Sequence, residues 1–324
     1  MTMPLLRVEH LKKYYPAPSP LFGPKRFVRA LDDVSFELNE GETLGLVGES
    51  GCGKSTLARQ LIRLENPTDG HIYLDDIDLG SLHGGKLRKM RGSFQMIFQD
   101  PYASLNPRMS VYSALEEALK LHTELDDSGR AERIAELLRQ VGLKPEHARR
   151  YPHQFSGGQR QRIGIARALA VHPRFIVADE PVSALDVSVQ SQIVNLLQDI
   201  QKETKVAFLF IAHDLAVVEH ISHRIMVMYL GRIAETGPAR ELCAHPAHPY
   251  TRALLSSVPT TRPEKRPERI VLTGDVPSPL NPPSGCRFHP RCPRCQPVCS
   301  REEPRLRPVD GCTGHCCACH FPFI

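Results

Sequence analysis

The segment from Gly48 to Thr56 contains the residue types that bind a nucleotide phosphate. It matches the pattern G-x-x-x-x-G-K-[ST], and the apolar run Thr43–Val47 before it favours a strand. A helix is expected to begin near Lys54, so its amino end would reinforce an anion site built from the loop N–H groups. The pattern predicts that Lys54 reaches the β- and γ-phosphates, that Ser55 binds Mg²⁺ and that Thr56 supports the α-phosphate. The strand–loop–helix order disfavours a chance glycine-rich turn, and the predicted loop residues are Gly48, Glu49, Ser50, Gly51, Cys52, Gly53, Lys54, Ser55 and Thr56.

Two adjacent acids follow a second apolar run, Phe175–Ala178. At the tip of a strand, Asp179 could hold Mg²⁺, usually through water, and Glu180 could polarise an attacking water. A solvated strand end is the alternative for an isolated acidic pair. Combined with the phosphate loop, the pair indicates nucleotide hydrolysis.

A second possible phosphate site lies at Phe155–Arg162, ahead of the expected helix Ile163–Ala170. A serine hydroxyl and glycine amides at a helix amino end attract phosphate, and the residues concerned are Ser156, Gly157, Gly158 and Gln159. One nucleotide cannot use two distant sites of one molecule, so the arrangement favours a dimer in which each chain completes the other's site.

These motifs resemble those of the ATPase subunits of ATP-binding-cassette transporters, whose signature is L-S-G-G-Q, and the resemblance covers residues 5–237. Phe155 replaces the signature leucine, which leaves Ser156 and Gly158 unchanged. Gln99 resembles the glutamine that links Mg²⁺ and the attacking water to the helical subdomain. Asp186, in Ser183-Ala184-Leu185-Asp186, resembles the loop that crosses the dimer interface, and His213 resembles the switch histidine that contacts the γ-phosphate.

An aromatic residue that stacks on adenine is expected near the start of the chain. Tyr15 fits this role by resemblance, and Tyr14 is its competitor. The resemblance implies ATP and Mg²⁺ as cofactors, and a sandwich dimer that closes on ATP and opens after hydrolysis. In it, Glu180 activates water, while Lys54 and His213 stabilise the charge of the transferring phosphoryl group.

The elements that position these residues follow from apolar periodicity. Alternation at Val34, Phe36 and Leu38 predicts a strand with one buried face, and helical spacing recurs on both sides of residue 130, ending before Gly142. Further strands are expected at Thr43–Val47, around Ile72 and Leu74, at Phe94–Phe98, Phe175–Ala178 and Val206–Ile211, with a hairpin at Arg224–Gly237. The predicted fold is α/β: a P-loop nucleotide-binding domain over residues 1–237, with an antiparallel β subdomain, a helical subdomain at about 100–170 and no internal duplication.

Composition sets limits on the class of protein. Among 324 residues, 41% are hydrophobic and 24% charged, which is typical of a globular protein. The net charge of +5 is scattered, so nucleic-acid binding is not expected. No membrane span or secretory signal is visible, so the cytosol is the expected compartment.

Residues 238–324 change in character and form an expected Pro/Cys-rich C-terminal appendage, loop-rich and held by something other than regular packing. The segments His248–Leu255, Pro277–Cys286 and Arg291-Cys292, with the long connection Pro16–Phe27, resemble the ATPases of dipeptide, oligopeptide and nickel importers. The nearest resemblance is to the second ATPase of bacterial dipeptide permeases. It implies a homologous ATPase partner in a heterodimer, two membrane permeases, indirectly a substrate-binding protein, and a place on the cytoplasmic face of the inner membrane. Nickel or glutathione import, an exporter, a soluble cassette ATPase and a metal-sensing tail are the alternatives.

Eight of the ten cysteines lie between Cys286 and Cys319, and in a reducing compartment such a cluster favours metal ligands over disulfides. By resemblance, Cys286, Cys292, Cys299 and Cys319 would hold a metal centre, for which a [4Fe–4S] cluster is the first expectation. Zinc is the rival, because Cys292/Cys295 and Cys316/Cys319 have C-x₂-C spacing. Free thiols are the third possibility. The ligand set stays open, because the segment contains four further cysteines: Cys295, Cys312, Cys316 and Cys317.

Overall fold

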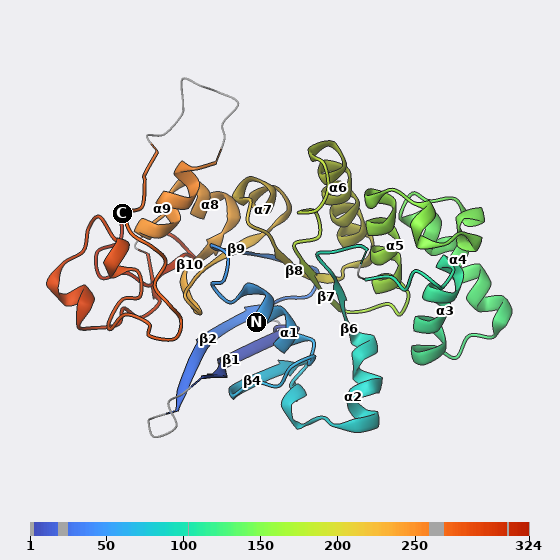
Figure 1. Cartoon of the computed structure of the whole chain (residues 1–324), viewed down its shortest axis with the longest axis horizontal. Helices are drawn as coiled ribbons and strands as arrows, with labels where there is room; N and C mark the ends of the chain where they lie inside the picture. Colours follow the sequence, from blue (N-terminus) through green and yellow to red (C-terminus); the bar gives the residue numbers. More distant parts are fainter. Residues whose placement is uncertain (1–2, 19–24, 103, 259–268, 310, 324) are drawn as a thin grey trace. The chain divides into compact units, whose positions relative to one another are not determined.

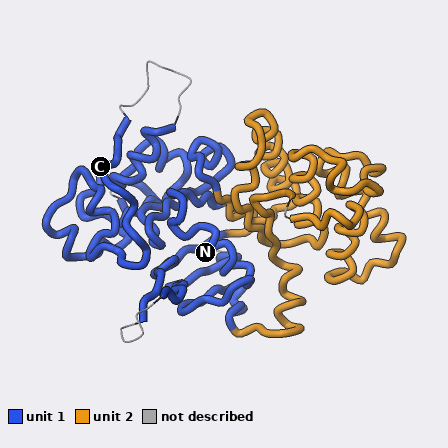
Figure 2. Tube along the Cα trace, in the orientation of Figure 1, with its two compact units in different colours: residues 1–38, 44–80, 212–324 blue, residues 39–43, 81–211 orange. Residues whose placement is uncertain are grey.

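The structure is a computed structural model that describes residues 3–18, 25–102, 104–258, 269–309 and 311–323. The chain divides into two compact units, drawn in different colours in Figure 2. Unit 1 contains residues 1–38, 44–80 and 212–324, and unit 2 contains residues 39–43 and 81–211.

Unit 1 has an antiparallel sheet in the order β2-β1-β4-β5 (Figure 1). Its strands are β1 (Leu6–Ala17), β2 (Arg26–Leu38), β4 (Asp69–Leu74) and β5 (Ile77–Asp78). The predicted antiparallel patch is therefore confirmed, although β1 was not foreseen. The expected connection Pro16–Phe27 is wrong at both ends, because Pro16 pairs with Phe27 and Ala17 with Arg26 in the β1–β2 ladder; residues 19–24 lie outside the described part.

The second sheet of unit 1 supports the phosphate loop. The strand order is β11-β12-β10-β9-β3, and β3 runs parallel to β9, with Val47 opposite Val227. A side chain at Gly45 would lie 2.2 Å from Cγ1 of Val218, so the glycine lets helix α7 pack against β3. The elements are β3 (Thr43–Val47), β9 (Arg224–Tyr229), β10 (Arg232–Pro238), β11 (Arg307–Pro308), β12 (Cys316–Cys317), α1 (Lys54–Leu61), α7 (Leu215–Ile221), α8 (Ala239–Ala244) and α9 (Pro249–Ser256).

Unit 2 joins three parallel strands, in the order β8-β7-β6, to a group of helices. The elements are β6 (Phe94–Ile97), β7 (Phe175–Asp179), β8 (Ala207–Ile211), α2 (Gly84–Met90), α3 (Val111–His122), α4 (Asp127–Gln140), α5 (Gly157–Leu169) and α6 (Val187–Thr204). The predicted strands and the helical segment are confirmed. Helix α5 begins at Gly157 rather than at Ile163, because Ser156 and Gln159 form a reciprocal capping box.

The C-terminal segment has more regular structure than its composition indicated. Strand β12 pairs antiparallel with β10, and β11 pairs with β12, so the tail extends the sheet of unit 1. The rings of Tyr229, Tyr250 and Phe288 pack together at centroid distances of 4.7–5.4 Å. The expectation of a segment without regular packing is therefore wrong, whereas its loop-rich character is confirmed, because β11 and β12 are only two residues long each. Among the described residues, no helix has both the length and the apolar character that crossing a bilayer requires.

Candidate nucleotide-binding site

The loop Gly48–Thr56 joins β3 to α1, as the sequence predicts. A side chain at Gly48 would lie 2.3 Å from the carbonyl oxygen of Met228, so the loop backbone packs closely on β9. The ammonium of Lys54 donates to the carbonyl oxygens of Gly48 at 2.7 Å and of Glu49 at 3.1 Å. Lys54 is buried, and these bonds hold its charge within the turn of the loop.

The C-terminal segment supports the first turn of this loop. The hydroxyl of Tyr250 accepts a hydrogen bond from the backbone N–H of Glu49 at 2.8 Å. Arg291 binds the Glu49 carboxylate through both terminal nitrogens, at 2.7 and 3.2 Å, and this hydrogen bonding raises the pKa of Arg291. Both ends of Glu49 are therefore fixed by residues more than 200 positions later in the chain.

Tyr250 and Arg291 were not predicted from the sequence as site residues. Both lie in segments that resemble peptide-importer ATPases, but no local pattern indicates that they contact the loop. Two features could have pointed to them: a tyrosine, buried in the structure, within His248–Leu255, and an arginine next to Cys292.

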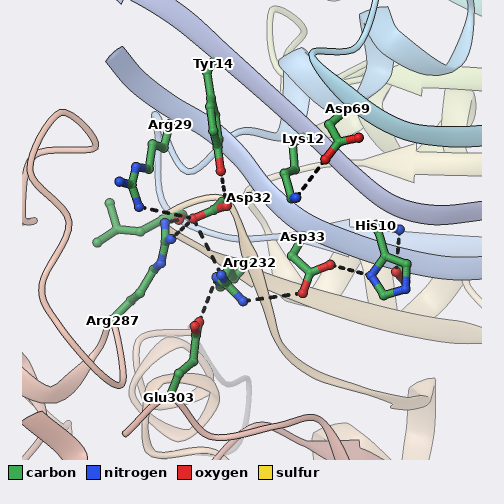
Figure 3. Close-up of polar contacts among 12 residues, drawn as sticks. His10, Lys12, Tyr14, Arg29, Asp32, Asp33, Asp69, Arg232, Arg287 and Glu303 are labelled. Atoms are coloured by element: carbon green, nitrogen blue, oxygen red, sulfur yellow. Dashed lines mark hydrogen bonds and ion pairs between the residues drawn. The ribbon is translucent and has the colours of Figure 1, made fainter. Parts of the chain in front are cut away.

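The two candidate adenine-stacking tyrosines have different surroundings. Tyr14 donates to Asp32, which also binds Arg287 and lies near Arg29 and Arg232 (Figure 3). Burial favours the neutral form of Asp32, but the Tyr14 hydrogen bond and the arginine charges outweigh it and lower the pKa of Asp32. The phenol of Tyr14 is thus part of an ionic network.

Tyr15 lies closer to the phosphate loop. Its hydroxyl donates a hydrogen bond to the Glu65 carboxylate. It also accepts a hydrogen bond from the side chain of Thr56, the last loop residue. The ammonium of Lys13 lies 5.1 Å from the centre of the Tyr15 ring.

In unit 2, the structure brings Gln99 and Glu180 together. Nε2 of Gln99 donates to Oε2 of Glu180 at 2.9 Å. Asp179, the last residue of β7, is buried, and Glu180 follows it with φ of 46°, a left-handed conformation that is unfavourable for glutamate. The Glu180 N–H is held by the carbonyl oxygen of Ile211 at 2.9 Å. A strained residue fixed beside an acidic strand end is a common feature of catalytic sites.

The second predicted phosphate site lies at the amino end of α5. Oγ of Ser156 accepts from the N–H of Gln159 at 3.3 Å, and Oε1 of Gln159 accepts from the N–H of Ser156 at 3.1 Å. Ser156 is exposed, so the cap also presents its hydroxyl to the surface. A side chain at Gly158 would lie 2.5 Å from Val189, so the glycine allows α5 to pack close to α6.

Asp186 and His213 lie at the starts of helices. Asp186 caps α6 by accepting from the N–H of Val189 at 3.0 Å, and the hydroxyl of Ser188 lowers its pKa. His213 is exposed and directly precedes Asp214, which caps α7. Thus unit 1 holds Tyr15, the loop and His213, whereas unit 2 holds Gln99, Asp179, Glu180, Ser156 and Asp186.

The four cysteines selected by sequence, Cys286, Cys292, Cys299 and Cys319, line a single pocket with apolar neighbours that include Phe288 and Phe321. Burial, with smaller contributions from the thiols of Cys319, Cys299 and Cys292, raises the pKa of Cys286 to about 12. The N–H of Cys286 donates to the carbonyl oxygen of Cys299 at 2.8 Å. Four thiols around one pocket are a donor set that fits a metal cluster.

Two family models match the chain. One, described as ABC transporter, covers residues 31–183, and the other, described as the C-terminal region of oligopeptide/dipeptide transporters, covers residues 234–299. The oligopeptide transport ATP-binding protein AppF of Bacillus subtilis is 53% identical over 98% of this chain and 97% of its own length. The dipeptide transport ATP-binding protein DppF of Escherichia coli is 51% identical over 96% of this chain and 93% of its own.

Solved structures agree with these matches. A dimeric ATP-binding cassette, MJ0796, bound to ADP and Pi in a post-hydrolysis state, is 29% identical with a TM-score of 0.64, over 72% of this chain and 99% of its own. The cbiO1 protein of Clostridium perfringens gives a TM-score of 0.65 at 28% identity, over 74% of this chain and 91% of its own.

The phosphate loop, the acidic strand end and the capped helix α5, with these matches, define a P-loop ATPase of the ATP-binding-cassette class. Sequence identity above 50% to AppF and DppF, over nearly the whole length of this chain, narrows the class to one family. The chain belongs to the oligopeptide and dipeptide transport ATP-binding proteins of ABC transporters.

Proposed function

We propose that this ATPase is the motor subunit of an importer that brings dipeptides or oligopeptides into a bacterial cell. The observation that carries the proposal is the match of the C-terminal region to oligopeptide/dipeptide transporters. This region includes Tyr250 and Arg291, which hold Glu49 of the phosphate loop. The segment typical of peptide transporters is thus built into the ATP-binding part of the molecule.

In the proposed reaction, Lys54 and His213 contact the terminal phosphates of ATP, and Tyr15 stacks on adenine. Ser55, Gln99 and Asp179 hold Mg²⁺, directly or through water, and Glu180 activates the attacking water. The contact between Gln99 and Glu180 and the left-handed conformation of Glu180 support these roles. Mg²⁺ would supply charge stabilisation at the phosphates.

Glu180→Gln tests the catalytic assignment. The amide keeps the shape of the side chain but cannot take a proton, so we expect ATP turnover in the reconstituted complex to fall at least 100-fold while ATP stays bound. Glu203→Gln, in the last turn of α6, is the matched control. Unchanged hydrolysis at both composite sites of the dimer would rule out Glu180 as the base.

We further propose that Ser156, Gly157, Gly158, Gln159 and Asp186 act on the nucleotide of a second, homologous ATPase chain. A heterodimer of this kind would drive two permease subunits at the cytoplasmic face of the inner membrane, with a substrate-binding protein on the other side. The exposed capped end of α5 supports the proposal, because it offers a hydroxyl and amides to phosphate.

The cap allows a sharp test of this second site. Aspartate is a good N-cap, so Ser156→Asp should keep the stability of α5 while its charge repels phosphate and blocks ATP-dependent dimerisation. Ser156→Ala should instead cost about 1 kcal/mol of stability and weaken dimerisation less. Loss of nucleotide binding to the phosphate loop of this same chain in Ser156→Asp would show that Ser156 acts in cis.

Measuring which substrate stimulates the transporter distinguishes peptide import from import of nickel or glutathione by the same ATPase. In vesicles containing the complete transporter, we expect ATP hydrolysis to rise with a peptide-loaded binding protein. Stimulation by nickel or glutathione alone would overturn the peptide assignment.

We also propose that residues 238–324 form a C-terminal appendage in which Cys286, Cys292, Cys299 and Cys319 hold a [4Fe–4S] cluster. The shared pocket supports this, because it brings four thiols from separate positions in the tail to one place. After anaerobic purification we expect iron and acid-labile sulfide, lost in Cys292→Ser and retained in Cys295→Ser, whose thiol is exposed. One zinc per chain without iron, removed by Cys292→Ser, would support the zinc alternative instead.

A further inference from the structure

A second group of metal-ligating side chains lies outside the four-cysteine pocket. Glu241 of α8, Cys312 and His315 each offer a ligand atom, and these atoms lie within 4.8 Å of one another. None of the three lines the pocket of Cys286, Cys292, Cys299 and Cys319. The group is therefore distinct from the cluster site proposed above.

His315 is the buried member of this group. Its side chain is completely buried, and Nε2 lies 2.7 Å from Oε1 of Glu235, a carboxylate that is also completely buried. Glu235 is fixed in turn by the N–H groups of Ala247 at 2.6 Å and His248 at 3.0 Å. Nδ1 of His315 has no hydrogen-bond partner among the described residues.

An unpaired buried nitrogen destabilises the fold unless a partner binds it. The carboxylate of Glu235 favours the tautomer with the proton on Nε2, which leaves a lone pair on Nδ1. A carboxylate that orients a histidine in this way is the usual second shell of a metal-bound imidazole.

Cys312 and Glu241 supply the negative charge of the group. The thiol of Cys312 donates a hydrogen bond to Oε1 of Glu241 at 3.2 Å. A cation bound here would replace the thiol proton between the sulfur and the carboxylate, so that a thiolate and a carboxylate would both face it. Nδ1 of His245, the residue that directly follows α8, lies 3.0 Å from the same Glu241 oxygen and helps to orient it.

We propose that Glu241, Cys312 and His315 bind a Zn²⁺ ion, with water as the fourth ligand. Thiolate, imidazole and carboxylate are the ligands that zinc takes in proteins, at about 2.0–2.3 Å. Tetrahedral coordination at these lengths requires ligand atoms about 3.3–3.8 Å apart, so the group needs to contract by roughly 1 Å. Glu241 is the partner that can move, because its side chain is 37% exposed.

Such a site would link α8 to the turn that precedes β12. Glu241 and Cys312 are 71 positions apart, so the ion would close a long loop of the C-terminal segment. Its role is structural, and it gives a function to Cys312, which the cluster does not use.

The test compares metal binding by the full-length chain and its variants after anaerobic purification. We expect the wild type to bind one more Zn²⁺ than Cys312→Ser in equilibrium dialysis, and to give with Co²⁺ a thiolate charge-transfer band that this variant lacks. Cys295→Ser is the matched control and should behave as the wild type, and Glu241→Gln should bind at least 10-fold more weakly. Iron content should be the same in Cys312→Ser and in the wild type.

Equal zinc binding by wild type and Cys312→Ser would overturn the proposal. Loss of iron in Cys312→Ser would also overturn it, since Cys312 would then be a cluster ligand. Circular dichroism of each variant verifies folding, and Glu241→Gln keeps the test valid if Cys312→Ser fails to fold.

Discussion

Arg291 binds Glu49 of the phosphate loop from a position directly before Cys292 in the chain. We expect Arg291→Ala to reduce the free energy of unfolding by about 2 kcal/mol, because it leaves a half-buried carboxylate without its charged partner. It should also weaken ATP binding, since the Glu49 backbone is part of the loop. Thermal unfolding and fluorescent-nucleotide titration measure the two effects. Arg294→Ala, which changes an exposed arginine three residues later, should alter neither.

Gly51 and Gly53 of the phosphate loop differ in the space that is available for a side chain. At Gly53, φ is 112° and a Cβ would lie 2.4 Å from the carbonyl oxygen of Ala30, whereas at Gly51, φ is 78° and nothing lies within 4 Å. Gly51→Ala should cost about 1 kcal/mol of backbone strain. Gly53→Ala should cost clearly more, because the backbone must also shift. Denaturant unfolding without nucleotide compares them, and equal losses would contradict the structure.

At the scale of elements, helix α9 depends on a neutral histidine. Nδ1 of His248 accepts from the N–H of Tyr250 at 3.0 Å, and burial lowers the pKa of His248 to about 4. Between pH 6.5 and about 4 the unfolded chain therefore binds a proton that the folded chain does not. Stability should fall as the pH falls through this range, by up to roughly 1.4 kcal/mol per pH unit from this residue, and the effect should vanish above pH 6.5.

His248→Asn isolates this effect, because asparagine can still cap α9. The variant should lose stability at every pH through poorer packing, yet show a shallower dependence on pH between 4 and 6.5. Chemical denaturation at several pH values measures the slope. The exposed His153→Asn should keep the wild-type slope, and a wild-type slope in His248→Asn would mean that His248 titrates normally.

Local patterns predicted the elements that carry the catalytic motifs. The strand before Gly48, the strand ending at Asp179 and the helices around residue 130 have the apolar periods expected of them. Strand β1 was missed because its ladder with β2 contains register shifts between Val8 and Lys12, which interrupt the alternation. The start of α5 was placed too late because the spacing Ser156-x-x-Gln159, a capping-box signal, was not used.

Contacts between distant positions could not be predicted in this way. Nothing near Arg291 indicates that it binds a residue 242 positions earlier, and nothing near His315 indicates that Glu235 orients its ring. Sequence resemblance grouped the four cysteines, but it did not separate Cys312 from the remaining thiols. These pairings depend on the folded sheet, which places β10 next to β12.

At the scale of the whole molecule, the residues proposed to act on ATP are distributed over both stretches of sequence that the units comprise. Unit 1 holds Lys54 and His213, and unit 2 holds Gln99 and Glu180. Mg²⁺–ATP should therefore slow amide hydrogen exchange around residues 48–56 and also around 97–100 and 179–186. Lys54→Met should abolish the protection at all of these segments, because without Lys54 the chain no longer binds the nucleotide that causes it. Protection limited to residues 48–56 in the wild type would contradict the roles proposed for Gln99 and Glu180.

The discontinuity of unit 1 has a consequence for synthesis on the ribosome. Unit 2 is complete once residue 211 has been made, but unit 1 needs residues up to β12, and the loop made near residue 50 obtains its Arg291 contact 242 residues later. At translation rates of roughly 5–20 residues per second, this delay is about 12–50 seconds. The phosphate loop is thus among the first parts of the chain to be translated and among the last to reach its final contacts. A nascent chain released early would carry an unfinished loop although its unit 2 is complete.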